Sequence, residues 1–403
     1  MSAVLPEEPN ILLDVTRLVS RSWTQRRSTG IDRVCYAYLH HFRSNALAVV
    51  QHRGAIKVFD AVGSRDLFER LLAPSEGFRA KLMAIAPRLL MNTLANEAIA
   101  GRTYVNVSHT DFDLPQHTQW VQRHGLRAVY LIHDLIPITH PEFSRPHAVN
   151  RHLGRVRLAL SGGAAIVVTS HAVADELADF AAREELPRPS PLVAPLGGEA
   201  LLRLHAQRRA APASPDSPSG HFLTVGTIEP RKNHRLLIEV WRDLVIRHGA
   251  AAPKLVIAGQ KGPMTGDILE PILHDPRLAK RIEWRKSVSD AELAGLMASA
   301  RAVLLPSLAE GFGLPLVEAL AMSVPVIASD IPVFREIGQA VPQLVDPRNT
   351  QAWRRAIETH MAREVTPKPF APPCWDDHFA ALAPIVEAFR LKSAAKCEGS
   401  LAA

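Results

Sequence analysis

The sequence predicts an α/β protein with two domains, each built on a parallel β-sheet. Short runs of β-branched residues alternate with longer helical patterns, which is typical of this architecture. Expected strands such as Leu-Val-Ile-Ala and Ala-Val-Leu-Leu are apolar on both faces, as strands covered by helices on both sides must be. At 403 residues the chain is also too long for one ordinary core.

The first predicted domain covers residues 1–205. Its expected strands are Ile11–Thr16, Leu47–His52, Tyr104–Ser108, Ala128–His133, Ala165–Thr169 and Pro191–Pro195. Its expected helices fall near Gly30–Phe42, Arg79–Ala100, Arg145–Leu160 and Ala172–Glu184. The proline- and serine-rich stretch at 206–220 is the predicted linker.

The second predicted domain covers residues 221–372. Its expected strands are Phe222–Gly226, Lys254–Ala258, Arg281–Trp284, Ala302–Leu305, Val324–Ala328 and Gln343–Val345, and its expected helices are His234–His248, Asp290–Ala300 and Leu314–Met322. The last segment, 373–403, contains an expected amphipathic helix at Trp375–Leu391. Ligands of open α/β sheets lie beyond the carboxyl ends of the strands, so a ligand is expected in the crevice between the domains.

Composition indicates a globular protein of the reducing cytoplasm. Apolar residues make up 47% and charged residues 22% of the chain, and no stretch approaches the ~18 apolar residues of a membrane span. The first ten residues carry acids and prolines where a signal peptide has cations and an apolar run. The cysteines Cys35, Cys374 and Cys397 are scattered, which is against a disulfide framework or a structural zinc site.

The net charge of +7 is compatible with nucleic acid, an anionic membrane surface or phosphorylated small molecules. The arginines are spread along the chain without interleaved aromatics, and no nucleic-acid-binding signature occurs, so nucleic acid is not expected as a partner. A solvated basic surface explains most of the charges, and peripheral contact with anionic lipid is a further hypothesis.

The segment Gly226–His234, with the sequence GTIEPRKNH, joins an expected strand to an expected helix. Glycine lets the backbone turn close to a ligand, and a helix N-terminus offers free N–H groups and a positive dipole end. Arg231 and Lys232 add two cations, so the segment is a candidate diphosphate site. A solvated basic turn is an equal alternative on this segment alone.

The segment Pro306–Leu320 contains a glycine-bearing loop and the start of a helix. Pro315 is expected in the first turn of that helix, where its missing N–H costs nothing. A carboxylate can accept two hydrogen bonds from adjacent hydroxyls, so Glu318 suits a ribose and Glu310 a donor sugar. A solvated helix position is the alternative for Glu318, although an isolated acid in so apolar a helix needs a reason.

Two weaker signals lie in the first domain. His133 ends an apolar strand, where it is a candidate to bond a sugar hydroxyl or to stabilise developing charge; a lone histidine is more often structural, and Asp134 suits a turn cap. The loop Ser28–Val34 contains Gly30, where the backbone can approach a donor or an acceptor. An ordinary helix start with Thr29 as N-cap is the alternative there.

Several motifs are absent from the sequence. It contains neither a GxGxxG dinucleotide fingerprint nor a P-loop, so NAD(P) binding and ATP hydrolysis are poorly supported. It contains no HExxH motif or clustered carboxylates, so no metal and no cofactor are expected.

Together these segments resemble the GT4 group of retaining glycosyltransferases, whose GT-B fold has two Rossmann-like domains facing each other across a cleft. The spacing of Glu310 and Glu318 resembles the group's E-x7-E motif, and the run VPVIASD at 324–330 follows it. Gly226–Asn233 resembles the GTxEPRKN form of its phosphate-binding segment, and HDLIP at 133–137 resembles its N-domain histidine segment. The resemblance is strong over about 220–347, moderate over 127–200 and thin before 127, where TGIDRV at 29–34 resembles some polysaccharide-assembly members.

The resemblance implies roles for these residues. Lys232 stands at the diphosphate lysine, Glu318 at the ribose and Glu310 at the transferred sugar, and His133 faces the reacting hexose from the opposite domain. Thr227 stands where many members carry arginine, and Arg231 is a candidate replacement. The implied catalytic set is His133, Glu310, Arg231 and Lys232, and the implied donor-binding set is Gly30, Gly226, Thr227, Arg231, Lys232, Gly311, Phe312, Gly313, Leu314 and Glu318. The C-terminal helix is implied to cross back onto the N-terminal domain.

The prediction is a retaining, metal-independent glycosyltransferase that moves a hexose from a nucleotide-diphosphate sugar to a hydroxyl of an acceptor. Lys232, Arg231 and a helix N-terminus would stabilise the charge that grows on the leaving diphosphate. A GDP-mannose-like donor is expected, with UDP- and dTDP-sugars next. The expected acceptor is a glycan or lipid-linked oligosaccharide of bacterial surface polysaccharide assembly, at the inner face of the cytoplasmic membrane. The alternatives are a nucleotide-sugar epimerase of the same fold, a glycosidase and a non-catalytic nucleotide-sugar-binding subunit.

Overall fold

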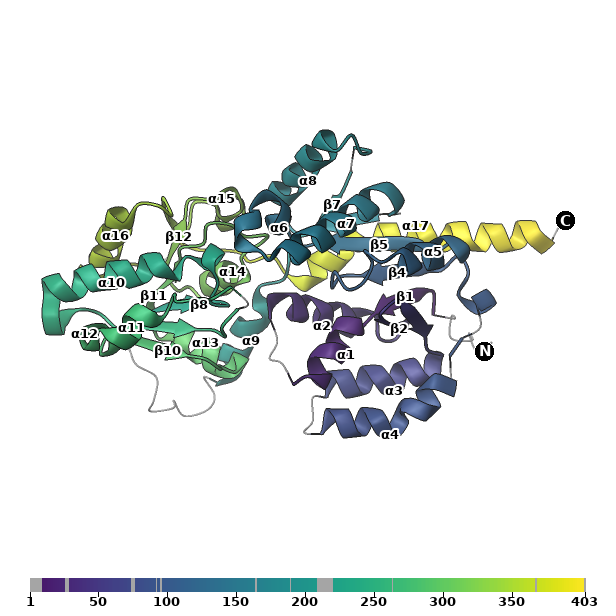
Figure 1. The fold of residues 1–403 in the computed structure, drawn as a ribbon, viewed down its shortest axis with the longest axis horizontal. Helices are drawn as coiled ribbons and strands as arrows, with labels where there is room; N and C mark the ends of the chain where they lie inside the picture. The colour runs from purple at the N-terminus through teal and green to yellow at the C-terminus, as the bar shows by residue number, and fades with distance from the viewer. Residues whose placement is uncertain are drawn as a thin grey trace.

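The computed structural model describes residues 9–25, 29–73, 77–91, 93–94, 96–163, 165–188, 190–208, 220–262, 264–366 and 368–401. Within these ranges two β-sheets form the centres of two domains that lie side by side, with helices on both faces (Figure 1). The predicted α/β class with two sheets in tandem is confirmed.

The N-terminal sheet has seven strands in the order β3-β2-β1-β4-β5-β6-β7. They are β1 (Ile11–Asp14), β2 (Ala46–His52), β3 (Ala55–Val58), β4 (Thr103–Asn106), β5 (Arg127–Ile132), β6 (Ala165–Val168) and β7 (Leu192–Val193). Every neighbouring pair is parallel except β2 and β3, which form an antiparallel hairpin at the sheet edge. The six predicted strands are present with ends shifted by one or two residues, whereas the short, largely exposed edge strand β3 was not predicted.

The C-terminal sheet has six parallel strands in the order β10-β9-β8-β11-β12-β13. They are β8 (His221–Val225), β9 (Leu255–Ala258), β10 (Ile282–Arg285), β11 (Ala300–Leu305), β12 (Val326–Ser329) and β13 (Gln343–Val345). In both sheets the strand order reverses after the first strand, between β1 and β4 and between β8 and β11. Each domain therefore has a topological switch point, where open α/β sheets bind ligands.

The N-terminal domain has more helical segments than predicted. They are α1 (Thr16–Trp23), α2 (Gly30–Phe42), α3 (Ala61–Leu72), α4 (Phe78–Met91), η1 (Asn96–Ile99), α5 (Pro115–Arg123), α6 (Ile136–Thr139), η2 (Pro141–Phe143), α7 (Pro146–Gly162) and α8 (His171–Arg183). The predicted helix at Gly30–Phe42 is confirmed residue for residue. The single predicted helix at Arg79–Ala100 is wrong, because α4 ends at Met91 and Leu94 N then donates to Val58 O beside the edge strand.

The C-terminal domain contains η3 (Pro230–Lys232), α10 (His234–His248), η4 (Gly249–Ala251), α11 (Glu270–His274), α12 (Pro276–Ala279), α13 (Asp290–Ala298), α14 (Leu314–Ala321), α15 (Pro332–Gly338) and α16 (Thr350–Ala362). The predicted helices α10, α13 and α14 are confirmed. α14 begins one residue before Pro315, as the missing N–H of that proline suggested. α16 was not predicted, although it buries Trp353 and Ile357 on one face.

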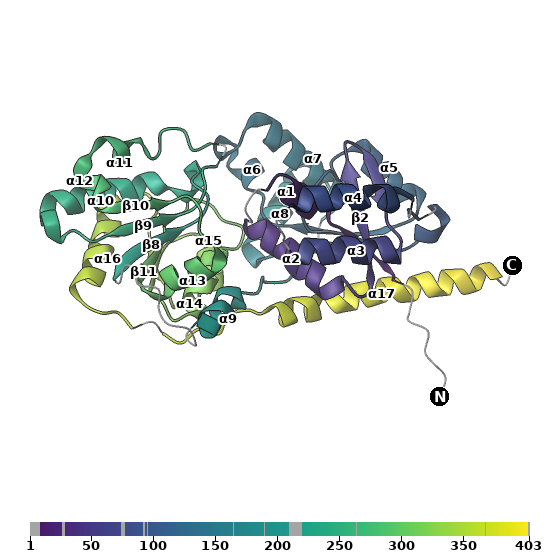
Figure 2. The ribbon, with the colours of Figure 1, turned by 90° about the horizontal axis from the view of Figure 1, so that it is seen from below.

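Helix α9 (Glu199–Arg208) marks where the chain passes from one domain to the other. α9 contacts α13 and α14 of the C-terminal domain and buries Leu201 (Figure 2). The start of the predicted linker at 206 therefore lies inside a helix, and residues 209–219 of that linker lie outside the described residues. One apolar cluster includes residues of both sheets, so the two domains share part of their core.

The C-terminal helix α17 (Trp375–Leu401) is longer than the predicted Trp375–Leu391. It runs along the N-terminal domain in both views (Figures 1 and 2). Its first turns contact α2, where Phe379 stacks on His41 with ring centroids 3.8 Å apart and Tyr38 Oη lies 2.8 Å from His378 Nε2. Among the described residues, no helix combines the length and the apolar character that crossing a membrane requires.

Candidate active site

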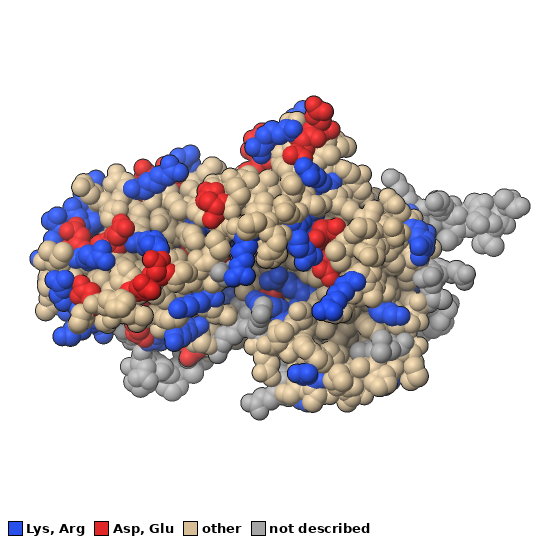
Figure 3. Space-filling model, viewed as in Figure 1, with Lys and Arg blue, Asp and Glu red and all other residues tan. Residues whose placement is uncertain are grey.

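A cavity of about 390 Å³ opens between the carboxyl ends of the two sheets. The N-terminal domain contributes the start of α2 and the loops after β5 and β6, and the C-terminal domain contributes the loops after β8 to β11 and the start of α14. Figure 3 shows basic side chains gathered in the hollow where the domains meet. Every site residue predicted from the sequence lines this cavity, namely Gly30, His133, Gly226, Thr227, Arg231, Lys232, Glu310, Gly311, Phe312, Gly313, Leu314 and Glu318.

Glu310 lies at the centre of a charged cluster on the C-terminal side of the cavity. Arg231 Nη1 donates to its Oε2 over 2.9 Å, Ser307 Oγ donates to its Oε1 over 2.7 Å, and Lys232 Nζ pairs with Oε1. Burial by itself would raise the pKa of Glu310, but the charges of Lys232 and Arg231 lower it to about 2. Glu310 is therefore ionised throughout the physiological pH range and is unsuited to act as a general acid.

Arg231 is held by two carboxylates. Besides its bond to Glu310, its Nε lies 2.7 Å from Glu229 Oε1, and its Nη1 donates to Ala309 O over 3.2 Å. Burial lowers the pKa of Arg231, and the charges of Glu310 and Glu229 raise it by more. The guanidinium is thus charged, fixed and close to Lys232, while Thr227 lines the same cavity without a charge.

The glycine-bearing loop after β11 docks on the N-terminal domain. A Cβ on Gly311 would lie 2.1 Å from His133 O, a distance that no side chain allows. Gly311 O accepts hydrogen bonds from Thr169 Oγ1 (3.1 Å) and Ser170 Oγ (3.2 Å) across the domain boundary. Gly313 has a φ of 91°, in the left-handed region that favours glycine, and precedes the first residue of α14.

Glu318 is buried, with 2% of the residue exposed, so the alternative of a solvated helix position is wrong. Arg33 Nη1 of α2 donates to Glu318 Oε1 over 2.5 Å, and Arg33 Nη2 donates to Asp290 Oδ1 over 2.6 Å. Glu318 Oε2 is buried without a hydrogen-bond partner among the described residues. Burial raises the pKa of Glu318 more than Arg33 lowers it, and the resulting pKa is about 7. The carboxylate thus has one acceptor oxygen available.

His133 enters the cavity from the end of β5 and is 7% exposed. Its Nε2 lies 2.8 Å from Val107 O, and because a carbonyl can only accept, Nε2 carries the proton. Burial lowers the pKa of His133 to about 4, so the ring is neutral and its Nδ1 is a hydrogen-bond acceptor. The neighbouring Asp134 accepts from Ile136 N over 3.1 Å, as expected for a turn cap, and also lines the cavity.

The start of α2 is fixed by Asp32. Its carboxylate accepts from Thr29 N (2.7 Å) and Thr29 Oγ1 (2.8 Å), and Arg17 Nε donates to it over 2.6 Å. Burial raises the pKa of Asp32, but the charge of Arg17 and the hydrogen bonds lower it by more. The carboxyl group is therefore ionised. These contacts hold Thr29 as the N-cap of α2, as the alternative for this loop predicted. They also place Gly30 and Arg33 in the cavity.

The charged residues that line the cavity but were not predicted as site residues include Arg33, Lys286 and Asp290. Lys286 directly follows β10, so the rule that ligands lie beyond strand ends could have found it. Arg33 gives no such signal, because its partner Glu318 is 285 residues away. In the described part of the chain, no group of three or more His, Cys, Asp or Glu side chains is arranged to hold a metal ion.

Solved structures that match almost the whole chain define its fold. The crystal structure of Anabaena Alr3699/HepE in complex with UDP and glucose matches with a TM-score of 0.57 and 16% identity, over 96% of this chain and 99% of that one. Sucrose-phosphate synthase from Thermosynechococcus elongatus matches with a TM-score of 0.56 and 16% identity, over 97% and 99% of the two chains. The protein has the GT-B fold.

Residues 219–363 match the family described as glycosyl transferases group 1. Over 240 residues the chain is 32% identical to the serotype-specific mannosyltransferase WbdA of Escherichia coli. The aligned region covers 53% of this chain and 27% of that relative. Over 141 residues the chain is 33% identical to the O-antigen chain mannosyltransferase RfbU of Salmonella typhimurium. The aligned region covers 34% of this chain and 37% of that relative. The matched region therefore spans about a quarter to a third of the length of these relatives.

Proposed function

We propose that this protein is a glycosyltransferase that transfers a hexose from a nucleotide-diphosphate sugar to a hydroxyl of a glycan or lipid-linked acceptor in bacterial surface polysaccharide assembly. The observation that carries the proposal is the cluster of Lys232, Arg231 and Glu310 in a cavity between the carboxyl ends of two sheets. The similarity to mannosyltransferases WbdA and RfbU supports it.

In this proposal the donor lies along the C-terminal side of the cavity. Lys232 and Arg231 bind the diphosphate, and the ribose hydroxyls donate to Glu318, whose Oε2 has no other partner among the described residues. The hexose lies between Glu310 and Nδ1 of His133, which can accept a hydrogen bond from it. We propose a GDP-mannose-like donor, because WbdA and RfbU are mannosyltransferases.

The protonation states favour a mechanism in which a phosphate oxygen of the donor takes up the proton of the attacking acceptor hydroxyl. Glu310 is ionised and His133 is neutral with its proton on Nε2, so neither is set to protonate the leaving diphosphate. As the bond from the anomeric carbon breaks, Lys232 and Arg231 stabilise the negative charge on the diphosphate, and Glu310 stabilises the cation-like sugar. The acceptor hydroxyl attacks from the side of the leaving group and gives its proton to a phosphate oxygen, which retains the anomeric configuration.

We further propose that the protein works at the inner face of the cytoplasmic membrane. A lipid-linked acceptor would be presented there, and the net charge of +7 favours contact with anionic lipid. The charge that grows on the leaving group is met by side chains of this chain, so the proposed reaction needs no metal and no cofactor.

Two measurements test the proposed function. Thermal unfolding with GDP-mannose, UDP-glucose or dTDP-glucose should show stabilisation of about 2.7 kcal/mol by the true donor at a hundred times its Kd, and GDP-mannose should act at the lowest concentration. NMR of the product should show the anomeric configuration of the donor. Stabilisation by none of the three, or an inverted product, would contradict the proposal. Conversion of the donor sugar without an acceptor would indicate an epimerase instead.

A further inference from the structure

We propose that Asp134 is a catalytic carboxylate of the transfer reaction, which contacts the transferred hexose from the N-terminal domain and stabilises its cation-like state. This inference rests on the proposed function, because it assigns a role in the same reaction. The sequence pattern predicts only a turn cap for this residue.

The charges of the cavity lining single out Asp134. Five acidic side chains line the cavity, and four of them are in ion pairs with an arginine or a lysine of the same lining. The paired acids are Glu229, Asp290, Glu310 and Glu318. Asp134 is the fifth, and it makes no ion pair with any residue that the structure describes. Within the described lining, its negative charge is therefore not offset by a contacting cation.

The loop after β5 leaves one oxygen of Asp134 available to a ligand. Its Oδ1 accepts a hydrogen bond from Ile136 N over 3.1 Å, which fixes the side chain as a turn cap. Its Oδ2 makes no hydrogen bond with the described part of the chain, and the residue is only partly buried. The turn cap thus uses one oxygen and leaves the other for the cavity.

Asp134 lies beside the proposed position of the hexose. It directly follows His133, and a Cβ placed on Gly311 would lie 2.9 Å from the Cβ of Asp134. Gly311 in turn directly follows Glu310. Since the hexose is proposed to lie between Glu310 and His133, Asp134 borders the same space.

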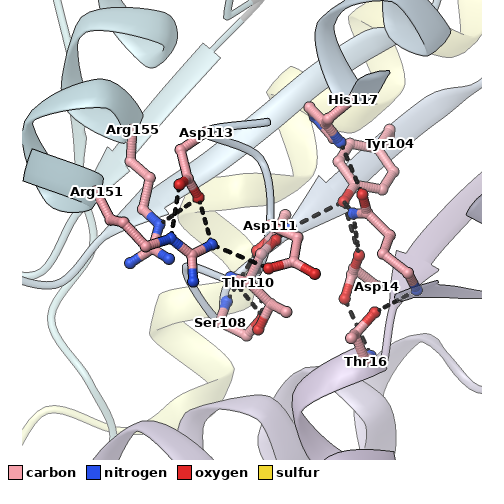
Figure 4. Close-up of polar contacts among 12 residues, drawn as sticks. Asp14, Thr16, Tyr104, Ser108, Thr110, Asp111, Asp113, His117, Arg151 and Arg155 are labelled. Carbon is pink, nitrogen blue, oxygen red and sulfur yellow. Dashed lines mark hydrogen bonds and ion pairs between the residues drawn. The ribbon is translucent and has the colours of Figure 1, made fainter. Parts of the chain in front are cut away.

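The backbone of Asp134 is held by a fixed part of the N-terminal domain. Its carbonyl oxygen lies 2.9 Å from His152 Nε2 of α7, and because a carbonyl can only accept, this nitrogen donates. Arg151 and Arg155 of the same helix donate to Asp113 over 2.7 and 3.0 Å and tie α7 to the loop after β4 (Figure 4). A charged group that is held in place in advance stabilises a transition state without the cost of reorganisation.

The charge of Asp134 also acts on the groups around it. Burial lowers the pKa of Arg231, and the charges of nearby carboxylates, Asp134 included, raise it by more. The pKa of Glu176 on α8 is raised to about 7, by burial first and then by the charge of Asp134. The negative charge of Asp134 is therefore felt across the space in which the sugar is proposed to lie.

A second carboxylate has a clear use in the proposed reaction. As the bond between the anomeric carbon and the diphosphate oxygen breaks, its electron pair leaves with the diphosphate and positive charge develops on the sugar ring. The acceptor oxygen forms the new bond, and its proton goes to a phosphate oxygen. Lys232 and Arg231 contact Glu310 and offset much of its charge. Asp134 forms no bond to the sugar and stabilises the positive charge by electrostatic attraction, with no contacting cation among the described residues to compete for it.

Release of GDP from GDP-mannose by the full chain tests the proposal, with water in place of the acceptor. Asp134→Asn keeps the oxygen that accepts from Ile136 N and removes the charge, so it should slow GDP release about a hundredfold. Calorimetric titration should give a Kd for GDP within about twofold of the wild-type value. Asp60→Asn is the matched control, because Asp60 accepts from Gly63 N over 2.7 Å at the start of α3 and does not line the cavity. It should leave GDP release within about twofold.

A charged sugar analogue gives a second measurement that needs no turnover. 1-Deoxymannojirimycin carries a positive charge in its ring when protonated, whereas 1,5-anhydromannitol has the same hydroxyls and no charge. With saturating GDP, the wild type should bind the charged ring more tightly than the neutral one. Asp134→Asn should weaken binding of the charged ring about tenfold and change binding of the neutral ring by less than about twofold.

The outcomes separate this inference from the proposed function. If Asp134→Asn releases GDP within about threefold of the wild-type rate, or if the wild type does not prefer the charged ring, the catalytic role of Asp134 is overturned and the proposed function is not. A loss in Asp134→Ala alone would assign Asp134 to the turn cap. Where the wild type releases GDP too slowly to measure, the comparison of the two rings decides. If no nucleotide sugar stabilises the wild type, the proposed function itself fails, and this inference with it.

Discussion

Arg33 Nη1 lies 2.5 Å from Glu318 Oε1, which joins the first long helix of the N-terminal domain to the helix that follows the glycine-bearing loop of the C-terminal domain. Both residues line the cavity between the domains. Because Glu318 is buried and has a pKa of about 7, the strength of this contact depends on pH in the physiological range. The ion pair between the two domains therefore depends on the charge of the proposed ribose-binding carboxylate.

Replacing Arg33 should shift the pH dependence of nucleotide binding. Only ionised Glu318 accepts hydrogen bonds with both oxygens, so in the wild type the affinity for GDP should rise as the pH rises through about 7. In Arg33→Met the attraction that lowers the pKa of Glu318 is lost, so the midpoint should move up by about one unit, which lowers the affinity at pH 7 about fivefold. Calorimetric titration from pH 6 to 9 measures this.

Arg43→Met is the control for that experiment, because Arg43 is exposed at the end of the same helix. It should leave the midpoint at the wild-type value. An unchanged midpoint in Arg33→Met would mean that Arg33 does not govern the ionisation of Glu318.

Glu310 should stabilise the fold near neutral pH and lose that effect in acid. Its pKa is about 2 in the folded protein against 4.5 in an unfolded chain, so its contribution is complete above about pH 4.5 and disappears as the pH falls toward 2. Glu310→Gln should lower the free energy of unfolding by about 3 kcal/mol at pH 7 and by much less at pH 3. Urea unfolding at both values measures the difference.

Glu239→Gln serves as the matched variant, since Glu239 is an exposed residue of α10. It should change the free energy of unfolding by less than about 0.5 kcal/mol at either pH. A Glu310→Gln effect that is equal at pH 7 and pH 3 would contradict the ion-paired state.

Lys232→Ala should reduce turnover far more than it reduces stability. Loss of one group that stabilises developing charge typically costs about 3 kcal/mol of barrier, or roughly a hundredfold in kcat. Steady-state kinetics with the donor found by thermal unfolding measures this. Lys254→Ala removes an exposed lysine before β9 and should leave kcat within about twofold. Near-normal turnover in Lys232→Ala would remove this lysine from the catalytic set.

His133 should remain neutral, with the proton on Nε2, throughout the working range. Burial lowers its pKa to about 4, so the folded ring resists protonation that an unfolded chain accepts below pH 6.5. This costs stability as the pH falls from 6.5 toward 4, and none above 6.5. Nitrogen-15 NMR of labelled histidine should show one unchanged tautomer from pH 5.5 to 8. A titration near pH 6.5, assigned by loss of the signal in His133→Gln, would refute this state.

The sequence by itself determined the α/β class, most strands and the location of residues that line the cavity between the domains. Strands of a two-sided parallel sheet are apolar throughout, so their positions are visible locally, and the segments Gly226–His234 and Pro306–Leu320 lie where parallel strands end. The rule that a buried charge needs a reason also identified Glu318 correctly as a residue set apart from its helix. These inferences depend on short-range patterns.

Only the tertiary structure decided which of these residues meet and in what charge state. The ion pair of Arg33 and Glu318 joins residues that are far apart in the chain, as do the hydrogen bonds that Gln51 and Tyr104 donate to Asp14, and no local pattern encodes such contacts. The pKa values of Glu310 and Glu318 differ by about five units although both residues are buried and share one motif, because Glu310 faces two cations whereas Glu318 faces Arg33 and the negative charge of Asp290. Burial and neighbouring charge are properties of the folded chain, so spacing alone could not assign these roles.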